Sequence, residues 1–246
     1  MRLENKTAIV TGGASGFGAG IVRKFIAEGA KVMVADIDGA AATAFASQSG
    51  GMAWQVDVSL NDSVEAMAKA AINAFGTVDI LVNNAGITHM PTPLEDVTED
   101  EFDRVLAVNA KSVYLTARHL VPHMKANGAG VILNVASTAG ISPRPGLNWY
   151  NASKGWMITA TKTMAVELAP DGLRVNALCP VAGETPLLKS FMGGDTPEIR
   201  AKFLASIPIG RFSTPEDMGN TAAFLCSDEA SMITGAALEV DGGRCI

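Results

Sequence analysis

The 246-residue chain has few aromatic residues, only three cysteines and no cluster of Lys or Arg. Its net charge is −6, so we expect neither a nucleic-acid surface nor an anionic-membrane surface. No apolar run approaches the roughly 18–20 residues that a membrane-spanning helix requires. Cys179, Cys226 and Cys245 have neither metal-ligand nor disulfide spacing, which indicates reduced thiols. The first predicted strand begins at Thr7, so we expect no signal peptide and a cytoplasmic protein.

Short apolar, β-rich runs alternate along the chain with amphipathic helical patterns. The 25 glycines and the 48% of hydrophobic residues suit close packing of helices on a sheet. Because this alternation places successive strands in parallel, the sequence predicts a three-layer, Rossmann-like, doubly wound α/β fold with helices on both faces of a seven-stranded parallel sheet. We find no linker or repeat, so we expect one domain over residues 1–246. The predicted strands are residues 7–10, 31–35, 52–56, 79–82, 131–136, 174–179 and 236–240.

A glycine-rich turn follows the first strand and opens a helix. Gly12 permits a tight turn, while Gly16 and Gly18 allow the backbone to approach a pyrophosphate and the helix to pack on the strand. By itself, such a turn also fits a plain strand–helix connection. Ser15 and Phe17 lie inside the turn, and we assign them to the same candidate phosphate-binding site.

Acidic and small residues follow the second, third and fourth strands. Asp36 ends the second strand, at the distance from the glycines expected for a carboxylate that accepts from the ribose hydroxyls of NAD. It would repel a 2′-phosphate, although a solvated loop aspartate is the plain alternative. Asp57 and Val58 are placed to contact adenine, and residues 83–86 are placed to border a flat ring. We therefore predict NAD as the cofactor, with Asn84, Ala85 and Gly86 beside it.

The helix predicted from Thr98 onward carries polar residues that need an explanation. Asn109 interrupts an apolar face, so it is either a hydrogen-bonded core amide or part of a polar site. His119 and His123 have the spacing of metal ligands on a helix, but no third ligand accompanies them. We predict no metal site and assign both histidines to a solvated or interface face.

Tyr150 and Lys154 lie four residues apart in a predicted helix, so they share one face. An ammonium beside a phenol favours the phenolate and lowers the phenol pKa, which would allow Tyr150 to exchange a proton with an alcohol near neutral pH. Ser137 ends a buried strand, at the edge where open α/β sheets bind ligands. Alone, a Tyr-x-x-x-Lys pair is ordinary helix surface; the strand-end residues make a catalytic pair the better interpretation.

Taken together, these motifs resemble the short-chain dehydrogenase/reductase family over essentially the whole chain. The glycine turn, residues 83–86 and the set Asn109, Ser137, Tyr150 and Lys154 match its motifs in order. The resemblance implies the strand order 3-2-1-4-5-6-7 and a homotetramer. It also implies that tyrosine is the general acid/base, that lysine holds the nicotinamide ribose, that serine binds the substrate oxygen and that asparagine holds a relay water.

The loop after the sixth strand departs from the family pattern. The family has Pro-Gly there, whereas Pro180 is followed by Val181, and Thr185 keeps the position that reaches the nicotinamide carboxamide. We assign Pro180, Gly183 and Thr185 to the cofactor site and residues 186–210 to a substrate loop or lid. Residues 183–188 and 241–244 resemble a branch that includes 4-formylbenzenesulfonate dehydrogenase, whose members oxidise polar alcohols or aldehydes.

The substrate pocket is predicted from residues near Tyr150 and from the lid. We expect a small polar, possibly anionic, alcohol, aldehyde or ketone, with Arg144 or His89 meeting its polar end. A solvated loop arginine is the alternative for Arg144, because prolines flank it. The predicted substrate residues are Thr88, His89, Ser137, Arg144, Asn148 and Trp149, with Phe191 or Met192 as the lid.

Three functions remain open from the sequence. The leading prediction is an NAD-dependent alcohol dehydrogenase or carbonyl reductase. A 3-oxoacyl thioester (acyl-carrier-protein) reductase is the alternative enzyme, although Asp36 and the lack of a basic patch argue against it. A redox-silent, NAD-binding regulator is the alternative of another class, and the complete set of four catalytic-type residues argues against it.

Overall fold

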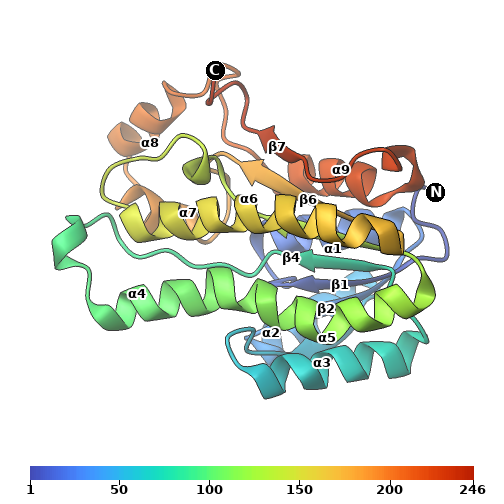
Figure 1. Ribbon diagram of the computed structural model, residues 1–246. Coiled ribbons are helices and arrows are strands. Elements are labelled where there is room, and N and C mark those ends of the chain that lie inside the picture. Colours follow the sequence, from blue (N-terminus) through green and yellow to red (C-terminus); the bar gives the residue numbers. More distant parts are fainter.

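Seven parallel strands form one sheet in the order β3-β2-β1-β4-β5-β6-β7, as the sequence predicted (Figure 1). The computed structural model describes residues 1–246. Every predicted strand is present, with ends that differ by at most one residue. Their bounds are β1 Thr7–Thr11, β2 Lys31–Asp36, β3 Met52–Gln55, β4 Ile80–Asn83, β5 Gly130–Val135, β6 Leu173–Pro180 and β7 Ala237–Val240.

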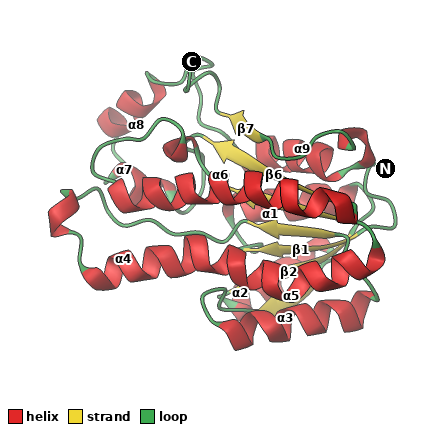
Figure 2. Ribbon diagram, in the orientation of Figure 1, coloured by secondary structure: helices red, strands yellow, loops and turns green.

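Helices cover both faces of this sheet and complete the three predicted layers (Figure 2). One face packs against α1 (Gly16–Ala27), α2 (Gly39–Ser49) and α9 (Pro215–Cys226). The other face packs against α3 (Asn61–Phe75), α5 (Ser112–Asn127) and α6 (Asn148–Leu168). No helix is both long enough and apolar enough to cross a bilayer.

The strands read as continuous apolar runs because both faces of the sheet are buried. In β1, Ala8 and Val10 enter the core beneath α1 and α9, whereas Ile9 enters the core on the opposite face. The same alternation holds in β2, where Val34 and Met33 face opposite cores. A parallel sheet between two helix layers therefore follows directly from the residue pattern.

Glycines set the spacing of the closest helix pair, α1 and α9. A Cβ atom on Gly20 would lie 2.0 Å from the Pro215 carbonyl oxygen, and one on Gly219 would lie 2.6 Å from the Gly20 carbonyl oxygen. Any side chain at either position would push the two backbones apart. Since α1 carries the glycine turn at its start, this contact also fixes that turn on the sheet.

Two further helical segments lie beyond the carboxyl ends of the strands. They are α7 (Leu188–Met192) and α8 (Pro197–Leu204), at the upper left of the molecule (Figure 1). They have a small hydrophobic cluster of their own, formed by Val181, Leu188, Met192, Ile207 and Phe212 and separate from the two main cores. We call residues 186–210 the lid.

The helix predicted from Thr98 contains an irregular turn. A capping box joins Thr98 and Glu101 at the start of α4 (Glu99–Leu106). Residues Ala107–Lys111 then form a π-helical turn that leads into α5. Such a turn inserts an additional residue into the helix and changes the direction of the side chains in it.

The α1–α9 contact yields a stability prediction. Gly20→Ala should lower the free energy of unfolding by about 1–3 kcal/mol, because the added methyl group cannot enter without separating the helices. Gly155→Ala is the matched control, since a Cβ there meets only the Gly140 carbonyl oxygen at 3.7 Å. Denaturant unfolding at one protein concentration measures the free energy of unfolding of both variants. Equal stabilities for the two variants would contradict this account of the packing.

Candidate active site

A cavity of about 440 Å³ lies at the carboxyl ends of the strands. Its wall is built from the loops that follow β1, β2, β3, β4, β5 and β6, together with the start of α6 and the lid. All but one of the predicted cofactor residues line it. They are Gly12, Ser15, Gly16, Phe17, Asp36, Asp57, Val58, Asn84, Ala85, Gly86, Tyr150, Lys154, Pro180, Gly183 and Thr185.

The glycine turn needs its glycines for two different reasons. Gly12 and Gly16 have φ angles of 60° and 51°, which side chains disfavour. Gly18 does not line the cavity; a Cβ there would lie 2.0 Å from the Gly12 carbonyl oxygen, so Gly18 serves the packing of the turn. Asn84 holds the turn from β4 by donating to the carbonyls of Thr11 and Gly12, at 2.9 and 3.0 Å.

Asp36 ends β2 at the cavity wall, in contact with the glycine turn. Its carboxylate accepts from the Ala14 N–H at 3.1 Å and from the Asp38 N–H at 3.2 Å. Each oxygen retains capacity for another donor, which suits the hydroxyls of a ribose. Because the turn leaves no Cβ at Gly12 or Gly16 and an acid stands beside it, these residues fit a dinucleotide without a 2′-phosphate.

Tyr150, Lys154 and Ser137 meet at one end of the cavity. Lys154 Nζ lies 5.9 Å from the centroid of the Tyr150 ring and donates to the Val135 carbonyl at 2.8 Å. Ser137 Oγ accepts from the Ala139 N–H at 3.1 Å. All three side chains are almost completely buried, so the ionisation of Tyr150 and Lys154 depends strongly on the surrounding protein.

The predicted lowering of the phenol pKa is not found. Burial raises the pKa of Tyr150, and the Ser137 hydroxyl only partly opposes this effect. Burial also lowers the pKa of Lys154 to about 8. Desolvation is the largest cause of both pKa shifts, and it depends on how the fold excludes water from the two groups, whereas their spacing in the sequence records only the charge of Lys154.

Asn109 lies in the π-helical turn and is fully buried. Its Oδ1 accepts from the Ile87 N–H at 2.9 Å, while its Nδ2 donates to the Ile87 carbonyl at 2.9 Å and to Ser153 Oγ at 3.0 Å. A Cβ on Gly86 would lie 3.3 Å from Lys154 Nζ and 3.4 Å from Asn109 Oδ1. Asn109 is therefore a hydrogen-bonded core amide, and its Oδ1 and Lys154 Nζ both lie beside Gly86.

Most of the predicted substrate residues lie away from the cavity wall. His89, Asn148 and Trp149 do not line it, and neither does Thr88. His89 is buried, and its Nδ1 bonds to the Met90 carbonyl at 2.8 Å. Asn148 is exposed at the start of α6. The indole of Trp149 donates to the Leu94 carbonyl and packs edge-on against Phe102, with ring centroids 5.2 Å apart.

The lid contributes Phe191, not Met192, to the cavity. Met192 is buried in the hydrophobic cluster of the lid, whereas Phe191 lines the cavity and meets the Tyr150 ring edge-on at 5.7 Å. Arg144 also lies outside the cavity wall and contacts the lid instead. The cavity wall also includes apolar or small residues that the sequence did not single out as site residues, among them Ile87, Val181, Leu187, Leu188 and Ser190.

The departure at Val181 is explained by a glycine two residues later. Gly183 pairs with Ser213 in a short parallel bridge, and a Cβ on Gly183 would lie 2.3 Å from the Phe17 ring. Val181 itself is buried in the lid cluster. The loop therefore takes a fixed path in which residue 183, rather than residue 181, approaches the glycine turn.

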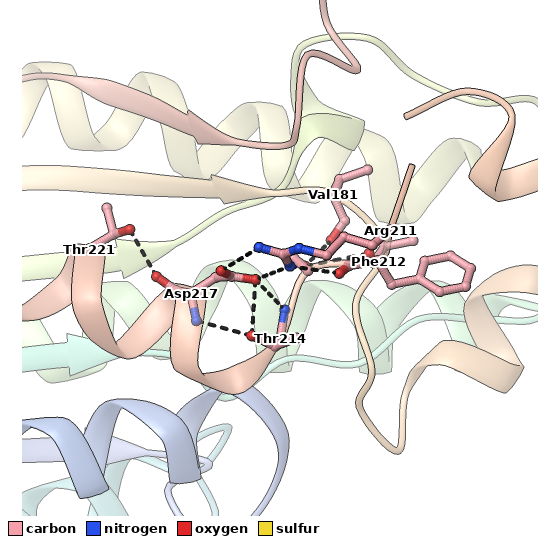
Figure 3. Close-up of polar contacts among 8 residues, drawn as sticks. Val181, Arg211, Phe212, Thr214, Asp217 and Thr221 are labelled. Atoms are coloured by element: carbon pink, nitrogen blue, oxygen red, sulfur yellow. Dashed lines mark hydrogen bonds and ion pairs between the residues drawn. The ribbon is translucent and has the colours of Figure 1, made fainter. Parts of the chain in front are cut away.

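An ion pair and a helix cap secure the second end of the lid (Figure 3). Arg211 binds both carboxylate oxygens of Asp217, at 2.6 and 2.9 Å, and this pairing holds the pKa of Asp217 at about 2. Asp217 also accepts from the Thr214 N–H at 2.8 Å in a capping box that starts α9. Ser213 Oγ donates to the Val181 carbonyl at 3.2 Å, so both ends of the lid are joined at its base.

The two histidines with metal-ligand spacing bond to asparagines. His119 Nε2 lies 3.0 Å from Asn61 Oδ1, and His123 Nε2 lies 3.1 Å from Asn127 Nδ2. No group of three or more His, Cys, Asp or Glu side chains in the structure is arranged to hold a metal ion.

Comparisons with known proteins agree with this geometry. A family model described as enoyl-(acyl carrier protein) reductase matches residues 12–244. The chain is 50% identical to 4-formylbenzenesulfonate dehydrogenase of Comamonas testosteroni, over all of both chains. It is 41% identical to 3beta-hydroxysteroid dehydrogenase 1 of Eggerthella lenta, over 99% of this chain and 95% of that protein.

A solved structure is also similar to this chain in both sequence and fold. It is a 3-ketoacyl-(acyl-carrier-protein) reductase of Brucella melitensis complexed with NADH, with a TM-score of 0.94 and 53% identity over 99% of this chain and all of that one. The predicted family and branch are confirmed by these matches. The chain thus belongs to the short-chain dehydrogenase/reductase family of oxidoreductases.

Proposed function

We propose that the protein interconverts an alcohol and a carbonyl compound with NAD as the hydride carrier. The observation that carries the proposal is the placement of Tyr150, Ser137 and Lys154 at one end of a cavity whose other end holds Asp36 and the glycine turn. The similar Brucella structure contains NADH, which supports NAD as the cofactor. When bound, the nicotinamide supplies the hydride acceptor or donor.

The chain's own residues divide the remaining work. The glycine turn would hold the pyrophosphate, Asp36 the adenosine ribose, and Asp57 and Val58 the adenine. Asn84, Ala85, Gly86, Pro180, Gly183 and Thr185 would border the nicotinamide half. All of these residues line the cavity, which supports the assignments.

Proton transfer falls to Tyr150. The hydroxyl of Ser137 would hold the substrate oxygen, and the phenol would remove the alcohol proton during oxidation or return it during reduction. Burial disfavours the phenolate, so the phenol of Tyr150 would keep its proton unless a nearby positive charge stabilises the anion. The Lys154 ammonium, fixed on the Val135 carbonyl, would stabilise the phenolate when it forms.

The wall beside Tyr150 favours a substrate with a ring next to the reacting carbon. Ile87, Val181, Leu187 and Phe191 line this end, and no arginine or histidine lines the cavity. The names of two relatives, 4-formylbenzenesulfonate dehydrogenase and 3beta-hydroxysteroid dehydrogenase 1, also denote ring-bearing substrates. We therefore propose a small aromatic or alicyclic alcohol or aldehyde, and any anionic substituent on it would point away from this apolar wall.

A 3-oxoacyl thioester reductase is the second candidate, because the similar Brucella structure is named for that activity. Turnover assays separate the two. Benzyl alcohol, 4-(hydroxymethyl)benzenesulfonate and cyclohexanol with NAD test the first, and acetoacetyl-CoA with NADH tests the second. A regulator without redox activity would turn over none of them.

We propose a cytoplasmic homotetramer. Apolar side chains remain exposed on the outer helices and on the edge strand: Tyr114 in α5 is 53% exposed, Trp156 in α6 44% and Leu238 in β7 38%. These residues suit burial between subunits. Light scattering at micromolar concentration should give four times the mass of the chain, and a monomer would refute the proposal.

The cofactor preference gives the first catalytic prediction. NAD should be preferred over NADP about tenfold to a thousandfold in kcat/KM, about 1–4 kcal/mol, because Asp36 repels a 2′-phosphate. Asp36→Asn keeps an acceptor for the Ala14 N–H but removes the charge, and it should narrow this preference at least about tenfold. Equal kcat/KM for both cofactors in the parent protein would rule the assignment out.

Removal of the phenol hydroxyl gives the second catalytic prediction. Tyr150→Phe should reduce kcat about 10²–10⁴-fold while NAD still binds, because the general acid/base is lost and the ring remains. Tyr114→Phe is the matched control: the chain has two tyrosines, and Tyr114 is exposed in α5. Parental turnover by Tyr150→Phe would show that the mechanism is wrong.

A further inference from the structure

The lid helices have few polar connections to the rest of the protein. From residue 186 to residue 206, one hydrogen bond reaches any residue outside 181–213: Arg144 Nη2 donates to Ser206 Oγ at 2.7 Å. The ion pairs of the lid, from Arg200 to Glu184 and Asp195, stay within the lid and its base. Within residues 186–206 the contact of Arg144 is therefore the single polar link to the body; farther along the lid, the Ile209 N–H donates to the Gly242 carbonyl at 3.1 Å.

Arg144 is held firmly on the body side. Pro143 and Pro145 flank it and fix two φ angles. Its carbonyl accepts from the side-chain amide of Asn151 at 2.8 Å, and Asn151 follows Tyr150 in α6. The position of Arg144 is consequently tied to the helix that carries the catalytic tyrosine.

A series of aromatic contacts leads from Arg144 back to that tyrosine. The guanidinium carbon lies 4.6 Å from the centroid of the Phe203 ring in α8. Phe203 meets Phe191 edge-on at 6.0 Å, and Phe191 meets Tyr150 edge-on at 5.7 Å. Phe191 is the lid residue that lines the cavity at this point, so its position determines the shape of the wall.

No carboxylate accounts for the half-buried guanidinium of Arg144. It forms no ion pair, and the charged side chain near it is another cation, Arg244, which donates to Ser142 Oγ at 3.2 Å. Burial and this neighbouring charge lower the pKa of Arg144. The favourable side-chain contacts of Arg144 are therefore those with the lid. The ammonium of a lysine cannot reproduce the stacking of a planar guanidinium on an aromatic ring.

We propose that Arg144 is a positioning residue for the substrate wall: by holding Phe203 and Ser206, it keeps Phe191 against Tyr150 and so fixes the shape of the substrate pocket. Its effect on turnover rests on the proposed function. Its effect on the lid does not.

Steady-state kinetics with benzyl alcohol and NAD test the first effect. Arg144→Ala should raise KM for benzyl alcohol about tenfold and leave kcat within about threefold, because the wall is displaced while Tyr150, Ser137 and Lys154 remain. Arg144→Lys should resemble Arg144→Ala. Adding Ser206→Ala to Arg144→Ala should change KM by less than about twofold, since the two residues act through one contact.

Limited trypsin digestion tests the second effect without any turnover. Lys189, Arg200 and Lys202 are cleavage sites within the lid. In Arg144→Ala, cleavage at these sites should be at least about fivefold faster than in the parent protein, while the thermal midpoint stays within about 2 °C because the two main cores are untouched. Mass spectrometry of the fragments identifies the sites.

Arg244→Ala is the matched control, because it removes a neighbouring guanidinium of the same charge that does not bond to the lid. It should leave both KM and the cleavage rate as in the parent protein. Cleavage of Arg144→Ala at the rate of the parent protein would overturn the proposal, and so would equal changes of KM and cleavage rate in Arg144→Ala and Arg244→Ala. Faster cleavage together with no turnover of any alcohol would instead reject the proposed function and leave the role of Arg144 in place.

Discussion

The buried ammonium of Lys154 joins the two elements on which the active site depends. Its Nζ donates to the carbonyl of Val135, the last residue of β5, while its backbone belongs to α6. This hydrogen bond, together with the one from Asn134 Nδ2 to Thr161 Oγ1 at 2.9 Å, fixes the helix of Tyr150 against the strand that leads to Ser137. A buried ammonium without a carboxylate is unfavourable, and the pKa of Lys154 falls to about 8. A Cβ on Gly86 would crowd the ammonium, at 3.3 Å from Lys154 Nζ.

The two halves of the cavity pack on hydrophobic clusters of different size. The glycine turn lies on β1 and on α1, whose backbone touches α9, and both belong to the large core on one face of the sheet. The lid has its own small cluster, the pairing at residues 183 and 213, the packing of Phe191 on Tyr150, the hydrogen bond from the Ile209 N–H to the Gly242 carbonyl, and the contact with Arg144. Segments with few buried contacts open most readily. The half of the cavity at the glycine turn therefore rests on the larger core, and the lid wall, which rests on the smaller cluster, is the part that is easiest to displace.

All the predicted cofactor residues except Gly18 line the cavity, whereas most of the predicted substrate residues do not. Asp36 and Gly86 each follow an apolar strand, and parallel strands bring their carboxyl ends to one edge whatever the side-chain details. His89, Asn148 and Trp149 are close to Tyr150 in sequence or to a recognised motif, yet they do not line the cavity. Where a loop residue points depends on contacts with distant segments, and no periodic pattern records them.

The sequence by itself determined the sheet, its helix layers and the order of the strand-end residues, because burial on both faces imposes a periodicity that can be read along one chain. It also determined the four-residue spacing that puts Tyr150 and Lys154 on one helix face. Only the tertiary structure decided that Phe191 faces the cavity, that Arg144 binds the lid and that the phenol pKa rises. These three properties depend on which segments meet and on how much water they exclude, and neither is a local property of the chain.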